Sequence, residues 1–181
     1  MSKNNKMDIE EPKVPLVKKD ASCNILIPKK APNKLMCEEA ANEDNSTVYM
    51  SAAKMQELEV LRGDPVVLTG KRRHTTVCIA LEGDTIDDGK LGMSKGIRRN
   101  LRVRLGDTVI VKPGTDVPNF TKVHILPFDD SVEGLTGDLT QSYLIPYFKD
   151  AYRPLYKGDT FIVRGNFRAV EFKVVACEPK E

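Results

Sequence analysis

The chain has 181 residues, enough for one large domain or two small ones, and its formal net charge at pH 7 is +2. With 40% hydrophobic and 30% charged residues, its composition excludes a fibrous or wholly disordered chain. No apolar run approaches the roughly 20 residues that span a bilayer, so we expect no direct membrane contact.

The positions of the cysteines and histidines indicate whether the chain could hold a metal site and whether it works in an oxidising or a reducing compartment. The four cysteines form no CxxC pair, and His74 and His124 lie far from any two-cysteine cluster, so no zinc site is expected. Residues 1–30 lack an apolar segment followed by a cleavage site, so a secretory start and a disulfide framework fit poorly. We interpret this as a reducing compartment and expect a cytoplasmic and nuclear protein.

In chain order, residues 1–30 hold seven lysines and no apolar period, which predicts a disordered tail. From Lys34 onward, short apolar runs broken by turn residues predict an all-β domain. One helix is predicted over 52–58, because Ser51 can cap it and Met55 and Leu58 fall on one face. The expected strands are 35–38, 47–50, 65–69, 75–81, 100–103, 108–112, 122–126, 161–163 and 169–175.

Three similar segments, 61–68, 104–111 and 156–163, each read as a Gly-Asp turn that leads into a strand. Glycine takes the tight backbone conformation, and the aspartate accepts backbone N–H groups. The first two copies predict one pseudo-symmetric barrel of two interlocked halves, and the third begins a further β unit. Prolines and a glycine predict a linker over 114–119, between domains over 31–113 and 120–178.

Six segments run in order over nearly the whole chain outside the tail: 42–46, 61–64, 99–107, 129–137, 147–154 and 167–175. Together they resemble the amino-terminal domain of the valosin-containing-protein family of AAA ATPases. The resemblance implies a mainly β fold with short helices. A double-psi β-barrel over 31–113 would be followed by a small four-stranded β-barrel over 120–178.

The resemblance also implies a function. In this family the domain is a non-catalytic module whose inter-barrel cleft binds UBX-type domains and short Arg-rich adaptor motifs. The resemblance also implies Ufd-type ubiquitin-binding cofactors as partners, and no nucleic acid. The full-length proteins add two ATPase modules, form a hexameric ring and extract ubiquitinated proteins. This sequence contains no phosphate-binding Gly-x-x-x-x-Gly-Lys-Ser/Thr loop. We therefore expect no enzyme activity and no cofactor here, ATP and Mg²⁺ in the absent modules, and a monomer.

Carried over by position, the resemblance implies an adaptor-binding site with an apolar floor and a carboxylate for a partner's guanidinium. Asp44 would be the carboxylate and Tyr152 an aromatic wall, while Arg62 would meet partner carbonyls. The floor would consist of Leu61, Ile79 and Leu81.

Two positions depart from the family. Leu61 stands where an aromatic residue is common, and Asn119 stands where a tyrosine is common, so Phe120 is expected to take over that aromatic role. Arg104 and Arg164 match positions that face the first ATPase module.

Other interpretations stay open on the residues alone. Leu61, Ile79 and Leu81 fall in strand-like runs, where such residues are more often core, and Asp44 could simply cap a turn. The related Ufd-type ubiquitin-binding adaptors share the barrel fold. A nucleic-acid-binding barrel would use the basic segment 71–104, which nevertheless has no aromatic residue for base stacking. No catalytic set can be built around His74, His124 or the Asp129-Asp130 pair.

Overall fold

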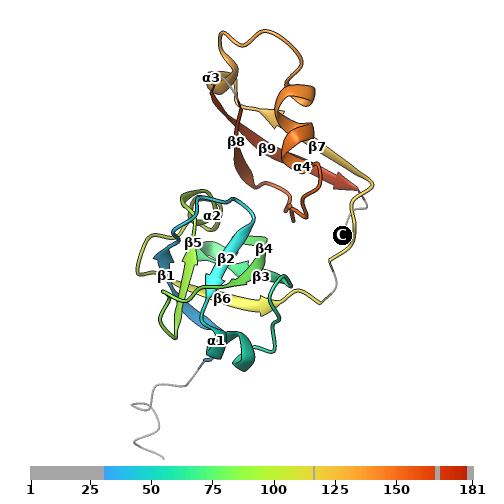
Figure 1. Ribbon diagram of the computed structural model, residues 1–181. Helices are drawn as coiled ribbons and strands as arrows, with labels where there is room; N and C mark the ends of the chain where they lie inside the picture. Colours follow the sequence, from blue (N-terminus) through green and yellow to red (C-terminus); the bar gives the residue numbers. More distant parts are fainter. Residues whose placement is uncertain (1–30, 116, 166–167, 179–181) are drawn as a thin grey trace, which may run out of the picture. The chain divides into compact units, whose positions relative to one another are not determined.

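Two β-sheets account for most of the regular structure in the computed structural model, which describes residues 31–115, 117–165 and 168–178. The predicted tail over 1–30 lies outside the described residues. A closed six-stranded barrel is followed by a three-stranded sheet, with short helices between strands (Figure 1). The predicted mainly β class is therefore confirmed.

The barrel closes in the strand order β1-β5-β2-β4-β3-β6. The pairs β1 with β5 and β2 with β4 are parallel, and the remaining pairs are antiparallel. The strands are β1 (Lys34–Glu39), β2 (Thr47–Met50), β3 (Pro65–Thr69), β4 (Thr75–Glu82), β5 (Lys90–Met93) and β6 (Thr108–Pro113).

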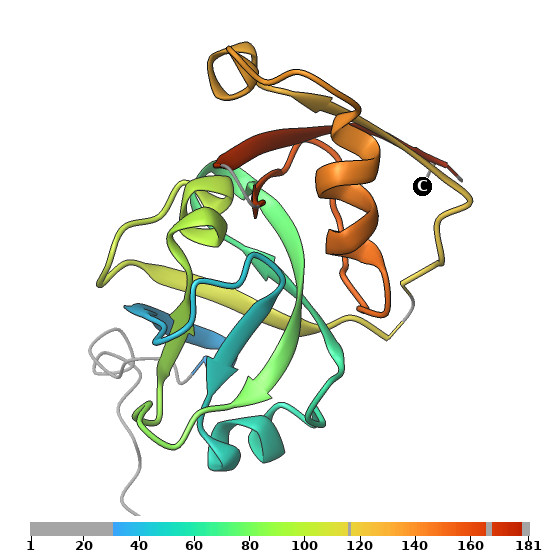
Figure 2. The same cartoon turned by 45° about the horizontal axis from the view of Figure 1, so that its top comes forward.

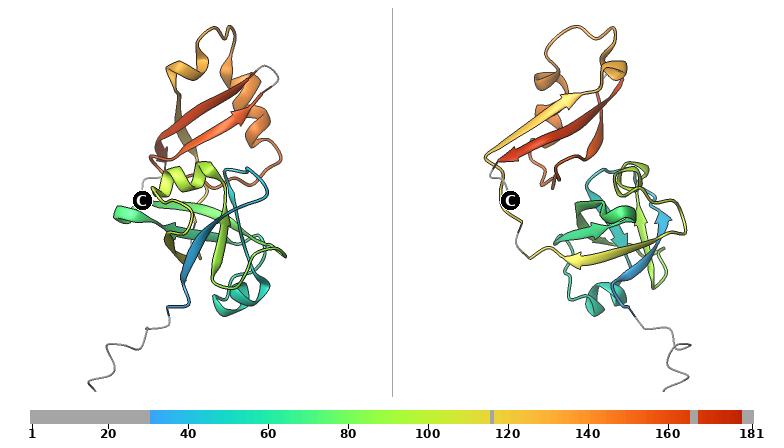
Figure 3. Two further views of the ribbon diagram at one scale, coloured as in Figure 1. Left: turned by 90° about the vertical axis from the view of Figure 1, so that its left-hand side faces the viewer. Right: turned by 180° about the vertical axis from the view of Figure 1, so that it is seen from behind.

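The barrel has an internal pseudo-two-fold relationship. Exchanging β1, β2 and β3 with β4, β5 and β6 reproduces every neighbour in the closed order. The helices follow the same rule, because α1 (Ala52–Glu57) joins β2 to β3 and α2 (Lys95–Leu101) joins β5 to β6. They lie at opposite ends of the barrel (Figures 1 and 3). The two interlocked halves predicted from the repeated segments are confirmed.

The three Gly-Asp turns share one set of backbone hydrogen bonds. In each, the glycine N–H donates to a strand residue, and the N–H of that residue donates back to the aspartate carbonyl, with distances of 2.7 to 2.9 Å. The glycines have φ values of 96°, 83° and 93°, where a side chain would be strained. The glycine and strand residues are Gly63 with Ala80, Gly106 with Cys37 and Gly158 with Val174.

The barrel core follows from strand alternation, because every second side chain points inward. β3 shows this simply, with Val66 and Leu68 fully buried between partly exposed neighbours. Burying each such side chain contributes about 1.5–3 kcal/mol to folding. The other residues with no exposed surface include Leu35, Val48, Met50, Ala80, Leu91, Met93, Leu101, Val109 and Val111.

The second sheet has the order β7-β9-β8, with strands β7 (Lys122–Pro127), β8 (Thr160–Arg164) and β9 (Ala169–Glu178). Its core is aromatic: Phe161 stacks on Phe172 at 5.6 Å and on Tyr147 at 5.3 Å between ring centroids. Tyr147 belongs to the helical segment that lies over one face of the sheet (Figure 2). The short helical elements are α3 (Asp129–Val132), η3 (Thr140–Leu144) and α4 (Ile145–Phe148).

This second sheet corrects one detail of the expected fold. The resemblance implied a four-stranded barrel, whereas the sheet has three strands among the described residues. Residues 128–159 contain three short helical elements and connecting turns instead of a further strand. Pro146 lies in the first turn of α4, a position where proline suits a helix.

Two elements of the barrel also differ from prediction. The expected strand over 100–103 is wrong, because α2 begins after Ser94, which accepts the Ile97 N–H, and ends at Arg102 with φ of 54°. Strand β5 was not predicted, since it is short and contains Gly92. A Cβ there would lie 2.4 Å from the Ile86 Cδ1 atom, so glycine permits this close approach. By contrast, the Ser51 cap of the first helix is confirmed.

Candidate functional site

A cavity of about 570 Å³ opens between the barrel and the second sheet. Its barrel wall comes from the loop after β1 and from the start of α2, and its other wall comes mainly from β8, Tyr147 and Arg153. Most of the residues that line it are polar or charged. Its charged residues are Glu43, Asp44, Lys95, Arg99, Arg153, Arg164 and Glu171.

Three ion pairs cross this cavity, each joining the barrel to the second sheet: Asp44 with Arg153, Arg99 with Glu171, and Glu43 with Arg164. The third pair is widely exposed, with side chains 63% and 75% accessible, so it contributes little to stability. The Asp44–Arg153 pair is better sheltered, at 35% and 21%. It is therefore the pair most able to fix geometry.

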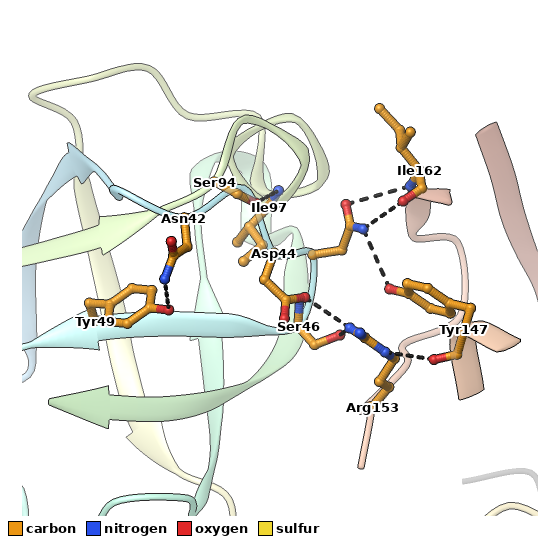
Figure 4. A network of polar contacts seen from close by, with 10 residues as sticks. Asn42, Asp44, Ser46, Tyr49, Ser94, Ile97, Tyr147, Arg153 and Ile162 are labelled. Atoms are coloured by element: carbon orange, nitrogen blue, oxygen red, sulfur yellow. Dashed lines mark hydrogen bonds and ion pairs between the residues drawn. The ribbon is translucent and has the colours of Figure 1, made fainter. Parts of the chain in front are cut away.

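Arg153 is held from both sides of the cavity (Figure 4). Its Nη1 donates to Asp44 Oδ1 at 2.9 Å and to Ser46 Oγ at 3.3 Å, and its Nε donates to the Tyr147 carbonyl at 2.8 Å. The guanidinium carbon lies 4.1 Å from the Tyr147 ring centroid, a cation–π contact. Asp44 Oδ1 also accepts the Ser46 N–H at 3.0 Å. Asp44 thus caps its turn and pairs with a cation.

Two asparagines of the barrel cover the open edge of β8. Asn45 donates to the Ile162 carbonyl at 2.8 Å and accepts the Ile162 N–H at 3.5 Å. Asn100 donates to the Thr160 carbonyl at 2.9 Å and accepts the Thr160 N–H at 3.0 Å and the Thr160 hydroxyl at 2.9 Å. Each amide therefore supplies the bonds that a neighbouring strand would make.

Asp159 forms a further link between the sheet and the barrel. Its carboxylate accepts a hydrogen bond from the hydroxyl of Thr76 in β4, a residue only 3% exposed. Burial raises the pKa of Asp159 to about 7. Burial and the carboxylates of Asp159 and Asp44 also raise the pKa of the Cys78 thiol. Cys78 therefore stays protonated and is a packing residue rather than a nucleophile.

The residues predicted for adaptor binding do not share one cavity. Asp44 lines the charged cavity together with Arg164. Tyr152 lines a second cavity, of about 290 Å³, with Asp64 and Pro65. Phe120 lines a third, of about 310 Å³.

Two further predicted residues, Leu61 and Ile79, are partners of residues that line the second cavity. Asp64 Oδ2 accepts the Leu61 N–H at 2.9 Å, but Leu61 itself does not line this cavity. Ile79 pairs with Pro65 across β3 and β4, so both belong to the same side of the barrel. Leu61 is 73% exposed and Tyr152 is 58% exposed. The interpretation of Leu61 as a core residue is therefore wrong.

The remaining predicted residues lie around these cavities. Leu81, like Ile79, is partly buried and follows it on the same face of β4. Arg62 and Arg104 are exposed in the first two Gly-Asp turns, and the Arg104 N–H donates to Asp107 Oδ2 at 2.7 Å. Arg104 does not line the charged cavity that holds Arg164.

Sequence reasoning missed Arg153, Asn45, Asn100 and Asp159, which fasten the second sheet to the barrel. Their partners lie between 60 and 117 residues away in the sequence, so no local spacing indicates them. Only the third Gly-Asp turn carried a signal. It marked Asp159 as a turn residue without indicating its partner.

A pseudo-symmetric barrel is joined to a small sheet, and large apolar side chains such as Leu61 and Tyr152 are exposed, which is typical of a protein-recognition module. Residues 34–117 match the family model described as Cell division protein 48 (CDC48), N-terminal domain. This segment, which spans β1 to β6, belongs to that family. Domains of the family are non-catalytic, and they bind cofactor proteins of AAA ATPases. No helix in the described part of the chain is long and apolar enough to cross a membrane.

Proposed function

We propose that this chain recruits adaptor proteins to an AAA ATPase that extracts ubiquitinated proteins, by binding UBX-type domains and short Arg-rich motifs. One observation carries the proposal: two large apolar side chains are exposed, Tyr152 (58%), which lines the second cavity, and Leu61 (73%), whose backbone N–H donates to Asp64 of that cavity. Large apolar side chains gathered at the surface commonly mark a protein-binding site.

The surface offers the two kinds of contact that such motifs require. Leu61, Ile79 and Tyr152 supply apolar area for a partner's apolar side chain. Asp44 supplies a partly exposed carboxylate, which pairs well with a guanidinium. Interfaces of this kind depend on a few buried apolar and arginine contacts rather than on total area.

The same proposal includes the rest of the parent protein. ATP and Mg²⁺ would be bound by its ATPase modules, and Arg104 and Arg164 would face the first of these modules. The exposure of both arginines supports that role. The parent would act as a hexamer in the cytoplasm and the nucleus, while the isolated chain would be a monomer.

Titration of a UBX domain into the isotope-labelled chain tests the proposal. We expect amide shifts around Asp44, Ile79 and Tyr152 and binding that tolerates salt, because apolar contacts contribute much of the affinity. An oligonucleotide titrated in parallel tests the rival class, a nucleic-acid-binding barrel, because its affinity for the oligonucleotide would fall steeply with salt. Absence of shifts and of binding at high micromolar UBX domain would overturn the adaptor proposal.

A further inference from the structure

The two oxygens of the Asp44 carboxylate have different surroundings. Oδ1 accepts hydrogen bonds from Arg153 Nη1 at 2.9 Å and from the Ser46 N–H at 3.0 Å. Oδ2 accepts no hydrogen bond from the residues that the structure describes. The Asp44 side chain is 35% exposed and lines the charged cavity. One oxygen is thus occupied within the chain, and the other remains available.

Arg153 is too well anchored to be an incidental surface partner. Besides Asp44, it contacts the Ser46 hydroxyl, the Tyr147 carbonyl and the Tyr147 ring, and its side chain is 21% exposed. Displacing it would remove all of these contacts at once. A cation arriving from outside would lose less by using Oδ2 than by evicting Arg153.

We propose that Arg153 is a positioning residue for adaptor binding, an inference that rests on the proposed function. It holds Asp44 Oδ1 so that Oδ2 faces the cavity and receives the cationic side chain of the adaptor. The adaptor's cation and Arg153 then share one carboxylate. Since Arg153 also connects the Asp44 turn to Tyr147, it fixes the spacing of the two walls that the adaptor contacts.

The first test compares variants, with an Arg-rich adaptor helix as the probe. Arg153→Gln should bind about tenfold more weakly, because the carboxylate loses its orientation, and Arg153→Lys should recover part of the loss. Asp44→Asn should weaken binding at least as much, because it removes the shared charge. Arg98→Gln is the matched control: it removes a similarly sheltered arginine, paired with Glu39, that does not line this cavity, and should bind normally.

The outcomes separate this inference from the proposed function. If the unaltered chain does not bind the probe, the adaptor proposal itself fails. If it binds and Asp44→Asn weakens binding, while Arg153→Gln binds equally or more tightly, the adaptor proposal stands. The positioning role is then wrong.

A second measurement needs no variant and covers the case in which Arg153→Gln does not fold. The Nε–H resonance of Arg153 reports its bond to the Tyr147 carbonyl. With saturating probe, this resonance should keep its bound position and its slow exchange with water. Movement to the position of a free arginine would mean that the partner displaces Arg153, and would overturn the inference.

Discussion

The Asp159 carboxylate accepts a hydrogen bond from the Thr76 hydroxyl and so joins the third Gly-Asp turn to the barrel. The equivalent carboxylates each accept an N–H of their own turn: Asp64 accepts the Leu61 N–H at 2.9 Å, and Asp107 accepts the Arg104 N–H at 2.7 Å and also pairs with Lys71 of the barrel. The backbone bonds of the three turns are the same. A repeated turn therefore uses its third aspartate to fasten the second sheet.

This use of Asp159 predicts a pH effect on stability. Burial raises the pKa of Asp159 from 3.8 to about 7. The carboxyl's contribution to stability is therefore fully present below pH 3.8 and is lost as the pH rises through about 7. Asp159→Asn should stabilise the protein above pH 7, by at most about 1.4 kcal/mol for each pH unit between the two pKa values. Urea unfolding at a series of pH values measures the difference.

Asp107→Asn is the control, because its expected effect on stability has the opposite sign. Hydrogen bonds from Lys71 and from the Arg104 N–H lower the pKa of Asp107. Its stabilising contribution is present above the unfolded pKa and is lost as the pH falls through the folded one. This variant should be less stable than the parent at neutral pH and should approach it in acid. If the stabilities of the two variants relative to the parent changed with pH in the same direction, the role assigned to Asp159 would be contradicted.

The cover of the β8 edge by Asn100 predicts a second effect. Asn100→Ala removes three hydrogen bonds to Thr160 and leaves backbone groups without their partner. We expect a loss of about 1–3 kcal/mol and faster hydrogen exchange at Thr160. Asn42→Ala, which removes one exposed bond to the Tyr49 hydroxyl, is the matched control and should change stability little. Unchanged exchange at Thr160 would contradict the edge role.

Glycines in the barrel should differ in how they tolerate alanine. A Cβ at Gly70 would lie 2.3 Å from the Leu101 carbonyl oxygen, a backbone atom at the end of α2. At Gly106 nothing lies within 4 Å, and only the φ of 83° opposes a side chain. Gly70→Ala should therefore cost about 3 kcal/mol and Gly106→Ala about 1 kcal/mol. Thermal unfolding of both variants checks this order, and a reversed order would be contrary to the packing at Gly70.

Local patterns predicted the strands whose alternation and flanking turns are clear. β3 was predicted residue for residue, since a Gly-Asp turn starts it and Val66 and Leu68 alternate with outward residues. The pattern failed at Leu101 and Val103, which are buried two residues apart at the end of a helix rather than in a strand. The Ser94 cap was the available signal there. Alternation alone does not distinguish a helix end from a short strand.

The site was less predictable than the fold for a physical reason. Asp44 was identified by resemblance, but its partner Arg153 lies 109 residues away and depends on how the second sheet meets the barrel. The exposure of Leu61 likewise depends on the turn that holds it, because its backbone N–H is fixed on Asp64. Such contacts arise from tertiary packing, which short-range spacing does not encode.

The pseudo-symmetry of the barrel supplies a control for adaptor binding. Leu61 lies in the first Gly-Asp turn and Leu105 in the second, where they are 73% and 54% exposed. Since neither side chain is buried, aspartate at either position should leave stability within about 0.5 kcal/mol of the parent. Leu61→Asp should nevertheless weaken binding of a UBX domain at least tenfold, because it places a charge against the partner's apolar side chain.

Leu105→Asp should leave that affinity unchanged, because no residue of the second Gly-Asp turn lines the cavity that holds Tyr152, whereas Asp64 of the first turn does. Calorimetric titration of both variants with the same UBX domain gives the comparison, after unfolding curves confirm equal stability. Equal weakening by the two substitutions would mean that the partner responds to the barrel's charge rather than to the Leu61 surface. If Leu105→Asp alone weakened binding of the UBX domain, the docking surface would lie at the second turn, on the opposite half of the pseudo-symmetric barrel.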